Sequence, residues 1–185
     1  MDTLTAIHTR CSIGKVKPDP LPRDLIEKLL AAGAQAPNHH AVRPWRFIVL
    51  TGAGRERLGG AMAQELHERK PDTPAEGLQA ERAKALRAPV LIAVAADKPA
   101  EAKVVEIENV CAAAAAAQNI LLAAHALGLG AIWRTGPAAT AAVVKHSLGL
   151  TPDQHLLGFI YVGYPLAEPA VPQRPNFADR TTWLE

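Results

Sequence analysis

The longest uninterrupted hydrophobic pattern in the chain lies in residues 104–130. Six alanines occupy 112–117, and alanine is the best helix-forming residue. Glutamates precede the run, where the helix dipole favours negative charge. Gly128 follows it, and glycine readily adopts the left-handed conformation that ends many helices. No charged residue lies within 110–127 when histidine is counted as neutral, which predicts a long helix buried on every side.

This uncharged stretch also approaches the length of a membrane span. Alanine is weakly hydrophobic, however, and the polar residues Gln118, Asn119 and His125 interrupt the stretch. Neither a cluster of lysines and arginines nor a belt of aromatic residues flanks it. The pattern therefore favours the core helix of a globular protein. Because alanines let another backbone approach closely, we also expect this helix to lie at a subunit interface.

The rest of the chain alternates between short apolar runs and longer amphipathic segments. Four runs have the length and composition of strands, at residues 45–50, 90–96, 131–133 and 156–162. Helices are predicted at residues 2–10, 21–33, 52–70, 78–86 and 140–148. The first of these is expected to turn Leu4, Ala6 and Ile7 inward. The irregular order predicts a sheet with helices on both faces rather than a regular βαβ series.

Composition narrows the class of protein. The length of 185 residues fits a single domain spanning 1–185. A formal net charge of +2 does not suggest binding to nucleic acid or to a membrane surface, and an aromatic content of 4% argues against a base-stacking surface. Cys11 and Cys111 are too far apart to indicate a disulfide framework or a metal site. The polar start after Met1 lacks an apolar secretory segment, so we expect a cytoplasmic protein.

The first segment that could carry chemistry is Thr-Arg-Cys-Ser-Ile-Gly-Lys at residues 9–15. Arg10 offers forked donors that match phosphate oxygens, and the hydroxyl of Ser12 with the loop amides can complete an anion clamp. Cys11 could be a reactive thiol, although no base is paired with it. On spacing alone, a solvated helix end is the simpler interpretation.

A second segment, residues 35–45, places Gln35, Asn38, His39 and His40 in a loop between two core elements. Such a loop can hold a ligand or a metal, or form a plain turn. A histidine pair without neighbouring cysteine or carboxylate ligands is poor evidence for zinc.

The third segment is Gly-Leu-Gly-Ala-Ile-Trp-Arg-Thr-Gly at residues 128–136. Here a helix precedes the glycines and a strand follows, which is the reverse of a dinucleotide-binding fingerprint. Trp133 and Arg134 could present an aromatic edge and a cation to a planar anionic ligand. Equally, Trp133 could pack in the core while Arg134 faces water.

In their order and spacing, the three segments together resemble the nitroreductase family of FMN flavoproteins. The resemblance rests on Arg-x-Ser after the first helix, on Ala-Pro-Asn-His-x-x-x-Arg-Pro-Trp-Arg-Phe at residues 36–47, and on residues 128–136. It covers nearly the whole chain and is closest to the short, single-domain bacterial members. It implies an α+β fold with a mostly antiparallel sheet between helices. It also implies an intertwined homodimer in which the long central helices pack together and the C-terminal tail reaches the partner.

The resemblance also implies roles for particular residues. Residues from one subunit would hold the ribityl-phosphate of FMN and close its pocket: Arg10, Cys11, Ser12, Trp133, Arg134 and Thr135. Gln35 and His39 would come from the partner subunit. The end of the long helix would bind NAD(P) through Ala123, Ala124, His125, Ala126, Leu127 and Gly128. Cys11 and Gln35 stand where the family commonly has arginine. Lys15 is positioned to compensate for the missing charge.

The implied activity is that of an FMN-dependent NAD(P)H oxidoreductase with a ping-pong mechanism. NADH or NADPH would deliver two electrons as a hydride, and a nitroaromatic, quinone or similar acceptor would take them at the same place. The flavin carries this chemistry, so no catalytic side chain is expected. Two alternatives remain open: a non-catalytic dimeric flavin- or anion-binding module, and a flavoenzyme of the same fold that dehalogenates its substrate or degrades flavin. A purely structural interaction protein would leave the clusters at Arg10 and Trp133 unexplained.

Overall fold

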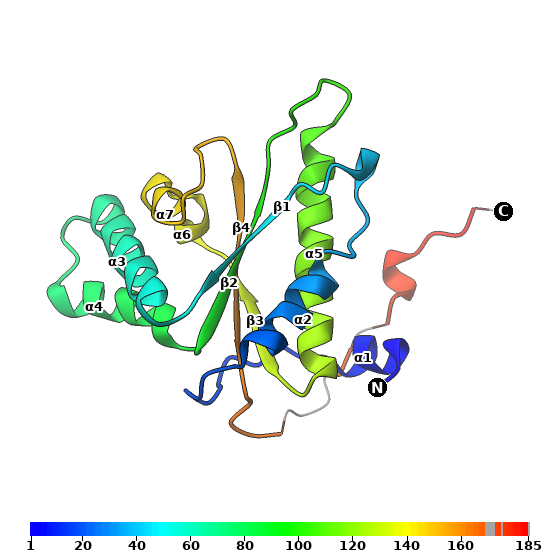
Figure 1. Ribbon diagram of the computed structural model, residues 1–185, viewed down its shortest axis with the longest axis horizontal. Coiled ribbons are helices and arrows are strands. Elements are labelled where there is room, and N and C mark those ends of the chain that lie inside the picture. The colour runs from blue at the N-terminus through cyan, green and yellow to red at the C-terminus, as the bar shows by residue number, and fades with distance from the viewer. Residues whose placement is uncertain (169–172, 175, 185) are drawn as a thin grey trace.

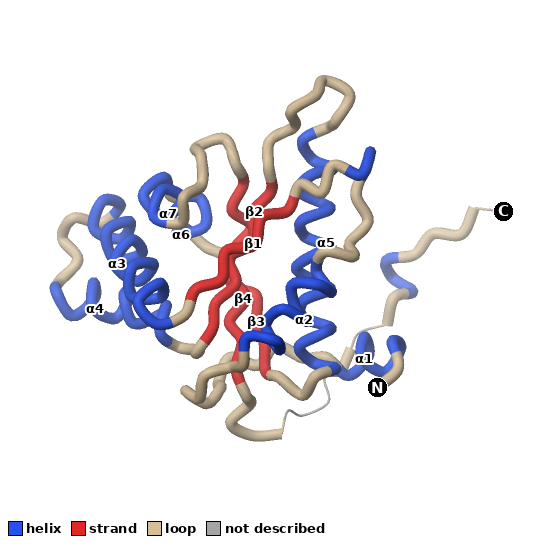
Figure 2. The backbone as a smooth tube through the Cα atoms, viewed as in Figure 1, coloured by secondary structure: helices blue, strands red, loops and turns tan. Residues whose placement is uncertain are grey.

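The computed structural model describes residues 1–168, 173–174 and 176–184, and is built around one four-stranded sheet (Figure 1). Within the described residues the strand order is β1-β2-β4-β3 and every pairing is antiparallel (Figure 2). The strands are β1 Trp45–Leu50, β2 Val90–Ala96, β3 Gly130–Arg134 and β4 His155–Gly163. All four strands expected from the sequence are therefore present, with β3 and β4 slightly longer than predicted.

Helices cover both faces of this sheet (Figure 1). Their bounds are α1 Thr3–Thr9, α2 Arg23–Gly33, α3 Gly52–Arg69, α4 Ala75–Ala83, α5 Glu106–Ala126, α6 Pro137–Thr140 and α7 Ala142–Ser147. Single turns of 3₁₀ helix occur at η1 His39–Ala41, η2 Lys84–Leu86 and η3 Ala178–Arg180. The helices α2 and α5 lie on one face, whereas α3, α4, α6 and α7 lie on the other. The expected α+β class with an antiparallel sheet between helices is confirmed.

The central strand β2 divides the core into two layers. Alternate side chains of a strand point to opposite faces. Val90, Ile92 and Val94 therefore join the layer under α2 and α5, while Leu91 and Ala93 join the layer under α3, α6 and α7. All five are buried. This explains why the strand is an unbroken apolar run instead of an alternating one.

The helix α5 packs its inner side against the sheet and against α2 (Figure 1). Ala113, Ala117, Ile120 and Ala124 are fully buried there. The helix ends as predicted, because Gly128 has a φ of +74°. By length and composition alone α5 could cross a membrane. Its contact with the sheet along one whole side is the arrangement of a core helix.

The prediction that α5 is buried on every side is wrong for the single chain. Side chains that share the outer side of the helix are exposed or half-buried: Ile107, Cys111, Ala114, Ala115, Gln118, Leu122 and Ala126. We call these residues the outer stripe. Their spacing of three or four places them on one side of the helix. The absence of charge identified an apolar helix correctly, but it could not identify what covers each side.

The opening helix differs from expectation in its orientation. Asp2 caps it, since the Asp2 side chain accepts the Thr5 N–H at 3.0 Å. Ala6 is buried as expected, but Leu4 and Ile7 are 67% and 47% exposed. In a helix of only seven residues the apolar spacing could not show which side meets the core.

Two other helices have different bounds from those predicted. The segment predicted as a helix at 78–86 begins earlier, as α4, and ends in η2, where Ala85 is buried. The segment at 140–148 overlaps two short helices, α6 and α7, because Ala141 between them is extended with φ −74° and ψ 132°.

Candidate functional site

The segment that follows α1 lies alongside the edge strand β3. The Ile13 N–H donates to the Ala131 carbonyl at 2.9 Å. This close approach depends on Gly130, where an added Cβ would lie 2.9 Å from the Ile13 side chain. Further along, an added Cβ at Gly14 would lie 3.1 Å from the Arg134 guanidinium. The first and third sequence segments are therefore neighbours in space.

Arg10 has an unsatisfied donor at this position. Its Nη1 is buried and has no hydrogen-bond partner within the described residues. Its backbone carbonyl accepts from Arg174 Nη2 at 2.5 Å, and the preceding Thr9 hydroxyl lies 2.8 Å from His125 Nε2. Buried polar atoms in folded proteins nearly always have partners, so this guanidinium is suited to an added acceptor such as an anion. Cys11 is half-buried beside it, and Ser12 is exposed.

Trp133 and Arg134 point to opposite faces of the sheet, as neighbours on a strand do. Trp133 packs against the core layer under α5, and its indole N–H donates to the Leu157 carbonyl at 3.1 Å. Arg134 is exposed on the other face and lies over the ring of Tyr161. Of the two interpretations that the sequence left open, the structure supports the one in which Trp133 packs in the core and Arg134 is exposed. Thr135 follows at the end of the strand and is exposed.

Gly158 on β4 permits this arrangement. Its φ is +130°, and an added Cβ would lie 2.8 Å from Trp133 Nε1 and collide with the Arg134 carbonyl oxygen. The pairing of β2 with β4 is irregular here, because Val94 pairs with Gly158 and Ala95 with Leu156, which leaves Leu157 without a partner on β2. Such irregularities re-aim side chains at the edges of functional sites.

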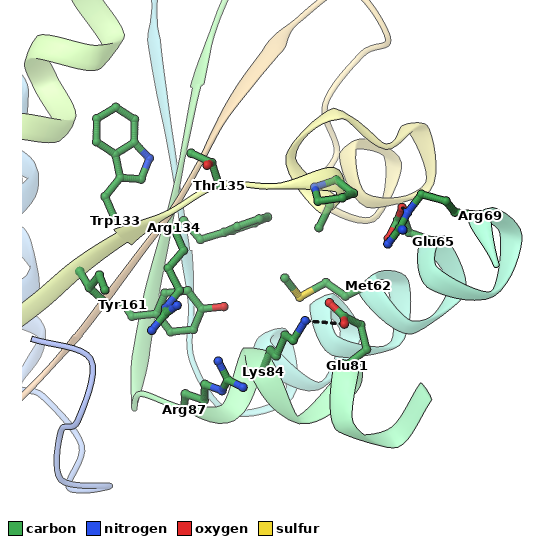
Figure 3. Close-up of a pocket in the computed structure, with 14 residues that line it drawn as sticks. Met62, Glu65, Arg69, Glu81, Lys84, Arg87, Trp133, Arg134, Thr135 and Tyr161 are labelled. Carbon is green, nitrogen blue, oxygen red and sulfur yellow. Dashed lines mark hydrogen bonds and ion pairs between the residues drawn. The ribbon is translucent and has the colours of Figure 1, made fainter. Parts of the chain in front are cut away.

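A cavity of about 520 Å³ opens beside Arg134 on the face covered by α3 and α4 (Figure 3). Its volume is within the range of small-molecule sites. Residues from α3, α4, η2, β3, α6 and β4, and from the segments that follow η2 and β3, line it: Met62, Glu65, Arg69, Glu81, Lys84, Arg87, Ile132, Trp133, Arg134, Thr135, Pro137, Ala138, Phe159 and Tyr161.

Positive charge exceeds negative charge around this cavity. Glu65 pairs with Arg69 at 2.5 Å, and Glu81 pairs with Lys84 at 2.5 Å. Arg87 and Arg134 also line the cavity, and neither forms an ion pair with a described carboxylate. The two unpaired guanidinium groups favour an anionic or electron-rich ligand.

Tyr161 forms part of the floor between these arginines. Burial raises the pKa of its hydroxyl, while the charges of Arg134 and Arg87 act in the opposite direction. The phenol therefore stays neutral at physiological pH.

The sequence predicted Trp133, Arg134 and Thr135 as site residues. It did not predict the other residues that line the cavity. Most of these belong to helices whose charges resemble an ordinary solvated surface. Glu65 and Arg69 are four residues apart, the spacing of a common surface pair. Only the burial of Glu65, at 7% exposed, distinguishes it. No pattern in the sequence could reveal that burial.

The two residues assigned to the partner subunit lie elsewhere in the chain. Gln35 is exposed and lines an open groove together with α1 and the second half of α5. His39 lies beside the start of α5, where its Nδ1 is 2.9 Å from Glu108. His125, which contacts Thr9 next to Arg10, lies about 25 Å further along the helix at about 1.5 Å per residue. His39 is therefore too distant to share a site with Arg10 of its own chain.

The residues expected to bind NAD(P) form the last turn of α5 and the turn after it. Ala124 is fully buried, and the His125 ring is held by Thr9. Ala123 and Ala126 line the same groove as Gln35. Two further members of this set are exposed: Leu127 and Gly128. The exposed members are the ones available to a ligand, and their role stays a prediction.

Comparison with known proteins agrees with the resemblance seen in the sequence. The model of the nitroreductase family matches residues 7–164. The chain is 32% identical over 166 residues to YdjA of Escherichia coli K12, covering 89% of each protein. It is 30% identical over 177 residues to YfhC of Bacillus subtilis, covering 95% of this chain and 91% of that protein. Both relatives are provisionally named NAD(P)H nitroreductases.

Solved structures share the fold. A nitroreductase-like family protein from Bacillus cereus superposes with a TM-score of 0.87 at 25% identity, covering 100% of this chain and 99% of that chain. A protein from Desulfovibrio desulfuricans, provisionally named a nitroreductase and crystallised in complex with FMN, has a TM-score of 0.77 at 27% identity with the same coverage. The sequence match across most of the chain and the shared fold lead to one conclusion: this chain belongs to the nitroreductase family.

Proposed function

We propose that the protein is an FMN-dependent NAD(P)H oxidoreductase that works as a homodimer and passes two electrons to an oxidised acceptor. Its membership of the nitroreductase family supports an oxidoreductase. The names of YdjA and YfhC support a nicotinamide donor, and the FMN complex of the Desulfovibrio protein supports the flavin. The observation that carries the proposal is the buried, unpartnered Nη1 of Arg10 on the segment that lies beside Arg134 and its cationic cavity.

The residues of this site fit FMN. Arg10 and the hydroxyl of Ser12 would hold the terminal phosphate, since a buried guanidinium nitrogen without a partner needs a strong acceptor. Cys11 would contribute its backbone beside them. Arg134 and Thr135 would border the ring system, which the cavity has the volume to receive. Bound FMN would supply the hydride chemistry, so the protein needs no nucleophile of its own.

The cavity walls contain both apolar and charged side chains, which would have different roles around bound FMN. Met62 and Phe159 would exclude water from one side of the ring system. Lys84, Arg87 and Arg134 would stabilise negative charge that accumulates there, because cations aimed at developing charge are strong contributors in a water-poor site. Trp133 packs on the opposite face of the sheet and is held by its hydrogen bond to Leu157, so it would keep β3 in place beside the cavity.

A homodimer is supported by the outer stripe of α5. Its members are apolar or uncharged, and several are exposed in the single chain. A twofold axis perpendicular to α5 would lay two such helices antiparallel. The start of one helix, with His39, would then lie near the end of the other, next to Arg10. Such a pairing would bring His39 to the partner's flavin and would cover the stripe with its own twin. Gln35 lies by the second half of α5, beside α1, and its contact with the partner's flavin stays a prediction.

The donor is NADH or NADPH, and the acceptor class is nitroaromatic, quinone or similar. Both would use the same face of the flavin in turn, which is a ping-pong scheme. Exposed residues at the end of α5, Leu127 and Gly128 among them, are proposed to contact the nicotinamide nucleotide.

The visible absorption spectrum of purified protein tests the proposal. After saturation with FMN and gel filtration, we expect flavin absorption at one FMN per subunit. Anaerobic NADH or NADPH should bleach it, and a nitroaromatic or quinone should restore it. Protein that stays colourless after saturation would refute the flavin assignment.

The same experiment separates the alternatives. Protein that keeps FMN but is reduced by neither nicotinamide nucleotide would be a flavin-binding module. Reduction by a nicotinamide nucleotide followed by release of halide, or by breakdown of the flavin itself, would identify a relative with different chemistry. Product analysis by mass spectrometry distinguishes these two outcomes from simple acceptor reduction.

A further inference from the structure

The carboxylate of Glu108, next to the outer stripe of α5, forms a hydrogen-bonded pair with His39. Glu108 lies in the first turn of the helix, and one of its oxygens is 2.9 Å from His39 Nδ1. Its second oxygen, Oε2, is buried and has no hydrogen-bond partner within the described residues. The hydrogen bond from His39 is the main reason that the pKa of Glu108 lies below its usual value. The pair lines an open groove along the stripe with Ile107 and Cys111.

This contact determines which nitrogen of the ring carries a proton. An ionised carboxylate can only accept, so Nδ1 of His39 must donate, and Nε2 is the nitrogen left for another partner. The neighbouring His40 ring stacks on His39, with centroids 4.2 Å apart and planes 21° apart. The ring is thus fixed in orientation as well as in tautomer.

The loop that carries His39 is held in an unusual backbone conformation. His40, Ala41 and Arg43 have φ values of 51°, 55° and 50°, in the left-handed region that side chains other than glycine rarely adopt. The Asn38 side chain accepts the Arg43 N–H at 2.8 Å and so closes the loop. Strained backbone of this kind persists where the surroundings impose it, and such residues concentrate at ligand sites.

The place of the pair along α5 identifies the ligand it can serve. His39 and Glu108 lie at the start of the helix, and Thr9 contacts His125 at its end. Figure 1 shows α1 beside this end of α5. In an antiparallel pairing of two α5 helices across the outer stripe, the start of each helix lies beside the end of the other. The Nε2 edge of His39 would therefore face the anion-binding segment around Arg10 of the second subunit.

We propose that Glu108 is a positioning residue for flavin binding, which holds His39 through its Nδ1–H so that the Nε2 edge of the ring contacts the FMN held by the other subunit. The inference rests on the proposed function and extends it to a residue that does not touch the cofactor. Flavin binding in one subunit then depends on a carboxylate of its partner. The same contact connects cofactor retention to the dimer.

A double-mutant cycle on the full-length dimer tests this inference. The variants are Glu108→Ala, His39→Ala and the combination, and FMN affinity is measured by fluorescence titration. Glu108→Ala should weaken FMN about tenfold, the lower range for loss of a charge-assisted hydrogen bond. In the His39→Ala background the same change should add nothing, because Glu108 acts through the histidine. An equal loss in both backgrounds, or no loss in either, would overturn the inference.

Glu106→Ala is the matched control. Glu106 lies in the same first turn of α5 and pairs with a histidine, His155, but that histidine belongs to β4. Its replacement should leave FMN affinity unchanged. If Glu108→Ala dissociates the dimer, Glu108→Gln preserves the volume and one acceptor oxygen, and it should weaken FMN while the dimer persists. A dimeric Glu108→Gln protein with unchanged FMN affinity would count against the role of charge.

Nitrogen-15 spectra of the histidine rings provide a readout that does not depend on the flavin. In FMN-free wild-type protein, the neutral His39 ring should carry its proton on Nδ1, where the Glu108 carboxylate accepts it. Glu108→Ala should remove that proton, and Glu106→Ala should not. An unaltered His39 signal in Glu108→Ala would refute the positioning role even if FMN binds. A wild-type protein that shows this His39 signal but takes up no FMN would instead refute the proposed function and, with it, the flavin as the ligand of His39.

Discussion

The guanidinium carbon of Arg134 lies 5.9 Å from the centre of the Tyr161 ring. The two residues are diagonal neighbours on β3 and β4, since Tyr161 pairs with Ile132 and Arg134 pairs with Phe159. Diagonal side chains on one face of an antiparallel pair are within reach of each other when they are long or aromatic. A cation over an aromatic face is attracted to it. The ring therefore holds an otherwise flexible arginine at the mouth of the cavity.

This relationship predicts how stability depends on alkaline pH. Burial raises the pKa of Tyr161 above its usual value. The unfolded chain then loses the phenolic proton at about pH 10, before the folded protein does, so the free energy of unfolding should fall as pH rises above about 10. Tyr161→Phe should flatten this fall while leaving stability at pH 8 nearly unchanged. Urea denaturation of both proteins at pH 8 and at about pH 11 measures the difference. Parallel pH profiles for the two proteins would contradict the prediction.

Replacement of Arg10 tests the anion clamp. Arg10→Ala should weaken FMN binding by about 1.5–3 kcal/mol, the range for a hydrogen bond to a charged group. Isothermal titration of the FMN-free protein measures this. Arg23→Ala is the control, since Arg23 forms an exposed pair with Glu27 and lies outside the site. An unchanged titration for Arg10→Ala would assign Arg10 to the surface.

Replacement of Gly158 tests the backbone geometry beneath the site. Gly158→Ala should displace Trp133 and Arg134, because the new Cβ would collide with the Arg134 carbonyl and approach Trp133 Nε1 to 2.8 Å. We expect a loss in the free energy of unfolding well above the roughly 1–2 kcal/mol of a left-handed residue alone. Gly149→Ala is the control, since Gly149 has a φ of +73° and open space around the added Cβ. Equal losses in urea denaturation would show that crowding at Gly158 is unimportant.

A charge on the outer stripe tests the dimer. Ala115→Glu would place a carboxylate among apolar neighbours at the proposed interface, where burial of an unpaired charge is costly. We expect the dimer and FMN to be lost together, as measured by light scattering and by flavin absorbance. Ala80→Glu, on the exposed side of α4, should change neither. A folded Ala115→Glu monomer that retains FMN would refute a site shared between subunits.

The strands and the end of the central helix were predictable because local chemistry controls them. The apolar runs at β1 and β2 have the bounds expected, and Gly128 ends α5 in a left-handed conformation. The segments around Arg10 and Trp133 were also recognisable, since each contains an unusual set of residues within a few positions. Their proximity was not visible, because it depends on how a loop passes an edge strand more than a hundred residues later.

The sequence by itself determined the α+β class, the four strands, the apolar character of α5 and the family. These properties depend on periodicity, composition and motif order, which are local or additive along the chain. Only the tertiary structure decided which side of α5 the sheet covers and that Leu4 and Ile7 are exposed. It also decided that Glu65, Lys84 and Arg87 line one cavity. It also brought Glu108 to His39. Burial and pairing of charges depend on distant segments meeting in space, and no local pattern of residues records which segments will meet.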